Sequence, residues 1–95
     1  MIVRIVKMKF REDEIENFLL LFRSVEGRIR SFKGCSALQL LSQTNDPSVI
    51  FTYSVWDSEE SLNHYRFSEL FKSTWSQTKM LFADKPEAWS LTVFN

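Results

Sequence analysis

Histidine occurs once in the chain, as His64, and Tyr65 follows it directly. An imidazole has an unperturbed pKa near neutrality, so His64 is a candidate general base, and the phenol beside it is a candidate hydrogen-bond donor. The alternative interpretation is structural: a half-buried histidine on a helix that hydrogen-bonds to a neighbour. No metal site is expected, because one histidine without a cluster of cysteines or carboxylates is a poor ligand set.

Aromatic residues lie on both sides of this pair in the sequence. Tyr65, Phe71 and Trp75 fall at helical spacing, which is typical of core packing but also suits the wall of a pocket for a flat apolar ligand. Tyr53 and Trp56 lie in the preceding apolar run and could add a hydroxyl and an indole N–H as orienting donors. The candidate substrate-binding residues are therefore Tyr53, Trp56, Phe71 and Trp75.

Six regular elements are predicted to position these residues. Apolar and β-branched runs predict strands, helical spacing of apolar residues predicts helices, and Gly34 is placed to end the first helix. Asp57 and Glu60 form a capping pattern for the second helix, which should bend or break near Phe67 and Ser68. The predicted order is a strand over 2–10, a helix over 11–32, a strand over 35–43, a turn over 44–47, a strand over 48–56, a helix over 58–82 and a strand over 87–94.

This βαββαβ order predicts an α+β, ferredoxin-like fold, in which a four-stranded antiparallel sheet carries both helices on one face. The other face would be uncovered. Either the set of Phe51, Tyr53 and Val55 or the set of Ile50 and Trp56 must point toward it. Because an exposed apolar sheet face is a partner site, we expect a homodimer that packs sheet against sheet.

The composition restricts the class of protein further. The 95 residues suit one domain over 1–95, and a content of 44% hydrophobic and 15% aromatic residues suggests burial beyond one small core, in a ligand pocket or an oligomer interface. Twelve basic and twelve acidic residues balance, so neither nucleic acid nor a membrane surface is indicated as a partner. The charged residues within 1–10 argue against a signal peptide or a membrane span. The single cysteine, Cys35, excludes an intramolecular disulfide and fits a cytoplasmic protein.

The chain resembles the antibiotic biosynthesis monooxygenase family of dimeric α+β barrel proteins over nearly its whole length. The resemblance rests on the βαββαβ order, on the segment RSFKGC at 30–35, and on the segment VWDSEESLNHYRFSELF at 55–71. In the second segment the matching residues are Trp56, Asp57, Ser58, Glu59 and His64.

The resemblance implies a monooxygenase that acts, without a metal or organic cofactor, on a small aromatic or quinol-like molecule in a pocket between helices and sheet. Such a substrate can be deprotonated to an anion that reduces O₂ directly, so the protein needs a base, an apolar cavity and donors for an oxyanion. His64 would be the base, and Tyr65, Trp56 or Tyr53 would donate. The alternatives are a non-catalytic dimer that binds a small molecule or serves in stress response, and a structural dimer whose aromatic residues fill the interior.

The haem-degrading branch of the family has a similar pattern, but this chain departs from it where haem is bound. Tyr65 stands where that branch has its second tryptophan, and Trp75 stands where it has the iron-binding histidine. The first predicted strand also lacks the asparagine of that branch. The resemblance therefore implies that haem is not turned over.

Overall fold

The computed structural model describes residues 1–94. The first predicted helix begins with a separate 3-10 turn, and the second is divided in two. The last strand ends at Leu91 instead of residue 94, because its ladder with the first strand ends at the pair of Val3 and Leu91. None of the helices formed by residues 1–94 is long and apolar enough to cross a membrane. The elements are β1 Ile2–Lys9, η1 Glu12–Glu14, α1 Ile15–Arg30, β2 Cys35–Gln43, β3 Asp46–Trp56, α2 Glu59–Arg66, α3 Glu69–Lys79 and β4 Glu87–Leu91.

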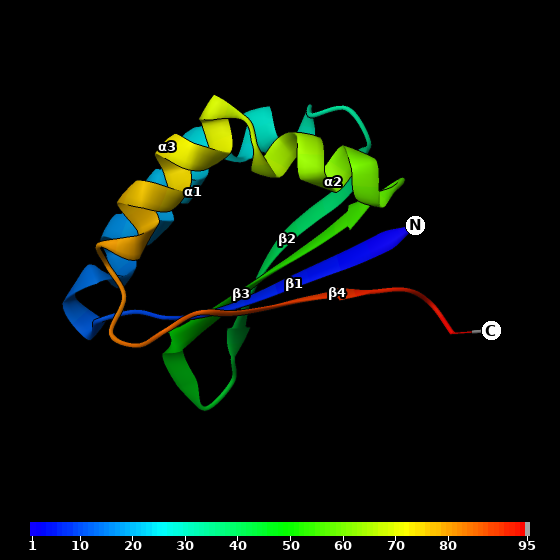
Figure 1. Cartoon of the computed structure of the whole chain (residues 1–95). Coiled ribbons are helices and arrows are strands. Elements are labelled where there is room, and N and C mark those ends of the chain that lie inside the picture. Colours follow the sequence, from blue (N-terminus) through cyan, green and yellow to red (C-terminus); the bar gives the residue numbers. More distant parts are fainter. Residues whose placement is uncertain (95) are drawn as a thin grey trace.

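The four strands form one antiparallel sheet in the order β2-β3-β1-β4, so that β1 and β3 are central and β2 and β4 are edges. Figure 1 shows α1, α2 and α3 together above one face of the sheet, while the other face carries no helix. The two crossovers from β1 to β2 and from β3 to β4 place the helices on this same side. The arrangement is the ferredoxin-like α+β fold that the element order predicted.

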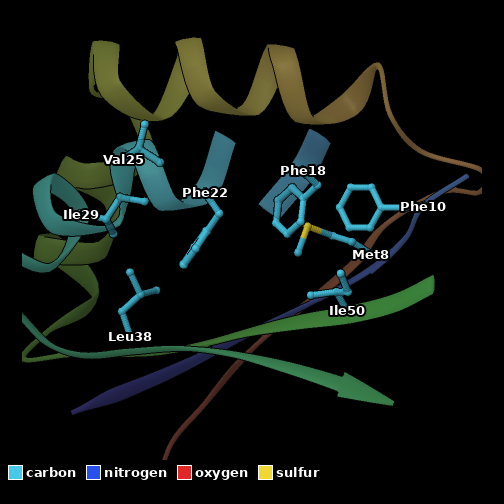
Figure 2. Packing of buried hydrophobic residues seen from close by; sticks show 8 residues of the cluster. All are labelled: Met8, Phe10, Phe18, Phe22, Val25, Ile29, Leu38 and Ile50. Atoms are coloured by element: carbon cyan, nitrogen blue, oxygen red, sulfur yellow. The ribbon is translucent and has the colours of Figure 1, made fainter. Parts of the chain in front are cut away.

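The core lies between α1 and the sheet (Figure 2). The buried side chains of α1 recur at helical spacing, and Figure 2 shows Phe22 pointing toward the sheet and Val25 toward the helix above α1. Phe10, just after β1, stacks on Phe18 with ring centroids 4.3 Å apart and so ties the start of α1 to the end of β1. The buried cluster consists of Met8, Phe10, Phe18, Phe22, Val25, Ile29, Leu38 and Ile50.

Serine side chains begin both of the shorter helices. The backbone N–H of Ser61 donates to Ser58 Oγ at 3.1 Å, so the N-cap of α2 is Ser58 and the prediction of Asp57 was wrong by one residue. The carboxylate of Asp57 instead accepts a hydrogen bond from the Ser58 hydroxyl at 3.2 Å. The N–H of Phe71 donates to Ser68 Oγ at 3.1 Å and starts α3, which confirms the predicted break.

Gly34 brings the start of β2 against the start of α2. Its φ is +90°, in the left-handed region that favours glycine, but α1 already ends at Arg30 with Ser31 as its C-cap, so Gly34 does not end the helix as predicted. A Cβ at this position would overlap the side chain of Ser61. The N–H of Asp57 also donates to the carbonyl oxygen of Gly34 at 2.8 Å. These contacts fix the position from which α2 crosses the sheet.

The register of β3 resolves which of its residues face the helices. Ile50 belongs to the core beneath α1, and alternation along the strand places Trp56 on the same side. Phe51, Tyr53 and Val55 therefore lie on the face without helices, together with their partners in register on β1 and β2 and with the β4 residues that pair with those of β1. Partly exposed apolar side chains gather on this open face, among them Leu41, Trp89 and Leu91.

Candidate functional site

A cavity of about 270 Å³ lies between the helices and the sheet. Its floor comes from β1, β2 and β3, its roof from α1, α2 and α3, and one side from Pro86 and the start of β4. This volume lies just below the range typical of small-molecule sites, roughly 300–1,000 Å³, and so suits a small ligand. The cavity is therefore large enough for a small organic ligand.

Four aromatic side chains form a connected series along the wall of the cavity. Trp56 stacks on Tyr65 with ring centroids 5.0 Å apart, and Tyr65 meets Phe71 edge to face at 5.2 Å. Phe71 then stacks on Trp75 at 5.9 Å with an angle of 13° between the rings. The space is thus open, with Phe71 and Trp75 as walls, and these side chains do not fill it.

Tyr65 carries the one hydroxyl group among these four aromatic side chains. Burial raises the pKa of its phenol, and the neighbouring Cys35 raises it further, so the hydroxyl is protonated at neutral pH. No group among residues 1–94 accepts a hydrogen bond from this hydroxyl. Within the same residues, no side-chain oxygen or nitrogen is both fully buried and without a hydrogen-bond partner, so the Tyr65 oxygen reaches accessible space. It can therefore donate a hydrogen bond to a ligand.

Trp56 contributes surface to the cavity but no donor. Its side chain is 1% exposed, and its Nε1–H donates to Ser54 Oγ at 3.0 Å. Because the indole N–H is already used, its predicted role as an orienting donor is not available in this geometry. Ser54 accepts this bond and keeps its own O–H, and it lines the cavity together with the hydroxyls of Thr52 and Thr74.

The structure places two predicted site residues away from the cavity. His64 is exposed on α2 and packs edge to face against Phe32 at 5.8 Å, and it is not part of the wall that residues 1–94 form. One step along a helix is a turn of about 100°, which separates His64 from the side chain of Tyr65. Tyr53 lies on the open face, because it alternates with the cavity residue Ser54. The geometry therefore gives no support for His64 as the base or Tyr53 as a donor.

Two arginines on the wall were not predicted. Arg4 lies on β1 and shares the helix-facing side with Val6 and Met8, and Arg66 is the last residue of α2. Burial lowers the pKa of the Arg4 guanidinium, and the charge of Arg66 lowers it further. The sequence alone did not single out Arg4, because both alternating sides of β1 carry charge, Arg4 on one and two lysines on the other.

The described residues offer no evident metal site. Within residues 1–94, no three histidine, cysteine, aspartate or glutamate side chains lie close enough together to hold a metal ion. The part of the cavity wall that they form contains neither histidine nor cysteine. Trp75, at the position of the iron ligand in the haem-degrading branch, packs on Phe71 instead.

Comparison with known structures supports the fold. No curated protein sequence matches the chain. A crystal structure of an antibiotic biosynthesis monooxygenase matches with a TM-score of 0.93 at 17% identity, over 100% of both chains. A candidate antibiotic biosynthesis monooxygenase from Nitrosomonas europaea gives 0.91 at 15% identity, again over 100% of both chains. A conserved protein from Methanosarcina mazei gives 0.90 at 18% identity, over 96% of this chain and 91% of the other. At these identities the likeness shows the fold alone.

Sequence comparison supplies the family. The sequence model of the antibiotic biosynthesis monooxygenase family matches residues 1–75, from the start of the chain into α3. The matched region contains Trp56, Tyr65, Phe71 and Trp75, the aromatic wall of the cavity. The chain belongs to the antibiotic biosynthesis monooxygenase family.

Proposed function

We propose that the protein is a monooxygenase that acts on a small aromatic or quinol-like molecule without a metal or organic cofactor. The observation that carries the proposal is the cavity of about 270 Å³ whose wall is formed by Tyr65, Phe71 and Trp75. A flat ring can lie against these side chains, where water is excluded and polar interactions with the ligand are strengthened. Membership of the family supports the reaction class.

The reaction needs no external reductant when the substrate is an activated carbon acid. Anthrone is a suitable example: it loses a proton from its CH₂ carbon, and the resulting anion reduces O₂. The carbon becomes a carbonyl, one oxygen atom of O₂ enters the product, and the other leaves as water with the two hydrogen atoms. The substrate carbon supplies all four electrons, so the protein has only to bind the anion and stabilise its charge.

Tyr65 is the residue proposed to stabilise that charge. Its phenol is protonated at neutral pH, burial moves its pKa still further above neutrality, and its hydroxyl has no partner among residues 1–94. A hydrogen bond from this hydroxyl to the oxyanion of the ligand would lower the energy of the deprotonated substrate. Ser54 and Thr74 supply further hydroxyls on the same wall. No base is assigned among these residues.

Oxygen consumption tests this function. Purified protein is mixed with a panel of anthrones, hydroquinones and flavonols in an oxygen electrode, and the rate without protein is subtracted. We expect consumption to saturate with the concentration of at least one compound. Saturable binding with no consumption would favour the non-catalytic binding protein, and neither binding nor consumption across the panel would contradict the proposed function.

We also propose that two copies of the chain pack through the open faces of their sheets. The support is the exposed apolar surface there: Leu41 is 47% exposed, Trp89 40% and Leu91 46%. Phe51 and Tyr53 extend the same face along β3. Stable homodimers commonly bury more than roughly 2,000 Å² of such surface in total, and a paired sheet face is suited to provide it.

A further inference from the structure

The cavity carries positive charge in a largely apolar wall. Arg4 faces the helices from β1, and its Nη1 donates to the neutral hydroxyl of Ser90 at 2.9 Å. The charges of Arg4 and Arg66 are close enough for Arg66 to lower the pKa of Arg4. Two guanidinium groups on the wall of one cavity repel, and an anion between them would reduce that repulsion.

Protein carboxylates do not neutralise this pair. The ion pairs among residues 1–94 join Lys9 with Asp46, and Glu26 with Arg23 and Arg30. None of them includes Arg4 or Arg66. Glu87 is the one acidic residue on the described part of the wall, and it forms no ion pair with either arginine. The wall therefore has two arginines against a single glutamate.

The exposure of the lining residues locates the opening of the cavity. Arg66, Glu87 and Ala88 are the exposed members of the wall, whereas Phe18, Trp56 and other apolar members are buried. The cavity therefore opens between the end of α2 and the start of β4. Arg66 lies at that opening, while the aromatic wall continues inward from it through Phe71 and Trp75.

We propose that the ligand of this cavity carries an acidic oxygen group, a carboxylate or an ionised phenol, which binds between Arg4 and Arg66 while its ring lies against Phe71 and Trp75. Arginine suits this role because its planar guanidinium can donate two hydrogen bonds to one anionic group. The inference rests on the proposed function, since it assigns a ligand class to the same cavity. It also adds a consequence: where the acidic group is a phenol conjugated with the reacting carbon, the arginines favour its ionised form, which is the electron-rich form that reduces O₂, whereas a carboxylate serves only to anchor the ligand.

Recognition of the ligand's charge can be measured without turnover by using two product-like probes that O₂ does not oxidise. Anthraquinone-2-carboxylate and anthraquinone-2-carboxamide share their rings and differ by one negative charge. Their affinities are measured by isothermal titration for the unmodified protein, for Arg4→Gln, for Arg66→Gln and for the double variant. Arg28→Gln, which removes an exposed arginine from the outer side of α1, is the control for net charge.

We expect the unmodified protein to bind the carboxylate roughly tenfold or more tightly than the carboxamide, as for hydrogen bonds to a charged group. Each single variant should reduce this preference for the carboxylate, and the double variant should abolish it. The affinity for the carboxamide should stay unchanged in all of these variants. The control Arg28→Gln should keep the preference of the unmodified protein. Equal affinity for both probes in the unmodified protein, or a preference that survives in the double variant, would overturn the inference and leave the cavity as an aromatic site. If neither probe binds, both the inference and the ligand cavity of the proposed function are contradicted.

Discussion

Trp56 and Tyr65 stack with their ring centroids 5.0 Å apart and their planes inclined by 21°. Trp56 is the last residue of β3 and Tyr65 lies near the end of α2, so the contact joins the sheet to the helices above it. Phe32 and Phe71 pack edge to face against Tyr65 at 5.3 and 5.2 Å. The phenol is thereby held in an apolar surrounding at the wall of the cavity.

This surrounding has a consequence for stability at alkaline pH. Burial raises the pKa of Tyr65 above the ordinary value of 10.0, so the unfolded chain loses the phenol proton at lower pH than the folded protein does. The contribution of this group to stability is complete below about pH 10 and is lost as the pH rises further. We expect the free energy of unfolding, measured by urea denaturation, to decrease above about pH 10. Tyr65→Phe, which keeps the ring, should weaken that decrease, and identical profiles for both proteins would contradict the effect of burial.

Removing the indole of Trp75 should weaken ligand binding. Trp75→Ala deletes one wall of the cavity and the stacked contact with Phe71. The lost apolar contact is worth about 1–2 kcal/mol, so affinity for an aromatic ligand should fall roughly tenfold. Phe67→Ala is the matched control, because this ring is 74% exposed and lies outside the described wall. Isothermal titration with anthraquinone-2-carboxylate measures the affinity of both variants. An equal loss of affinity in the two variants would show that the ring of Trp75 does not contact the ligand.

His64→Ala should leave oxygen consumption unchanged within about twofold, since the imidazole is exposed and contacts Phe32 instead of the cavity. An exposed aromatic pair of this kind contributes about 0.5–1.5 kcal/mol, so a small fall in melting temperature is expected. The measurement is the rate at the oxygen electrode with the best substrate of the panel. A loss of tenfold or more, with the fold intact, would restore His64 as the base.

A charge on the open sheet face should separate the proposed dimer. Trp89 on the edge strand β4 is opposite Ile5 in register and lies on the open face, where it is 40% exposed. Trp89→Lys would place an ammonium group in the interface, where it would be desolvated without a partner. Sedimentation equilibrium at micromolar concentration should give a dimer for the unmodified protein and for Phe67→Lys, and a monomer for Trp89→Lys. A monomeric unmodified protein would contradict the pairing of sheets.

The fold could be predicted from the sequence because each element carries a local signal. Apolar residues such as Phe18, Phe22 and Ile29 follow helical spacing, and the break between α2 and α3 follows from the capping ability of Ser68. Which of the two alternating sets of β3 residues faces the helices could not be predicted. Both sets contain large apolar residues, and either could have faced the helices.

The candidate site was predictable only in part, for a geometric reason. Tyr65 on α2 meets Phe71 across the break between α2 and α3, and Phe71 stacks on Trp75 one turn further along α3, so the three predicted aromatic residues do lie together. Spacing could not show that the neighbouring imidazole of His64 packs on Phe32, since that contact depends on the path of the chain after α1. The position of Arg4 on the cavity side could be assigned only after the faces of the sheet were known.

Incorporation of labelled oxygen tests the proposed function most directly. Anthrone is incubated with the protein under ¹⁸O₂, and the product is examined by mass spectrometry, with the reaction without protein subtracted. We expect one ¹⁸O atom in each molecule of anthraquinone formed, at a rate that falls on the order of a hundredfold to a thousandfold in Tyr65→Phe, as for the loss of one oxyanion donor. A rate equal to that without protein, or labelled product formed equally fast by Tyr65→Phe, would contradict oxygenation at this cavity.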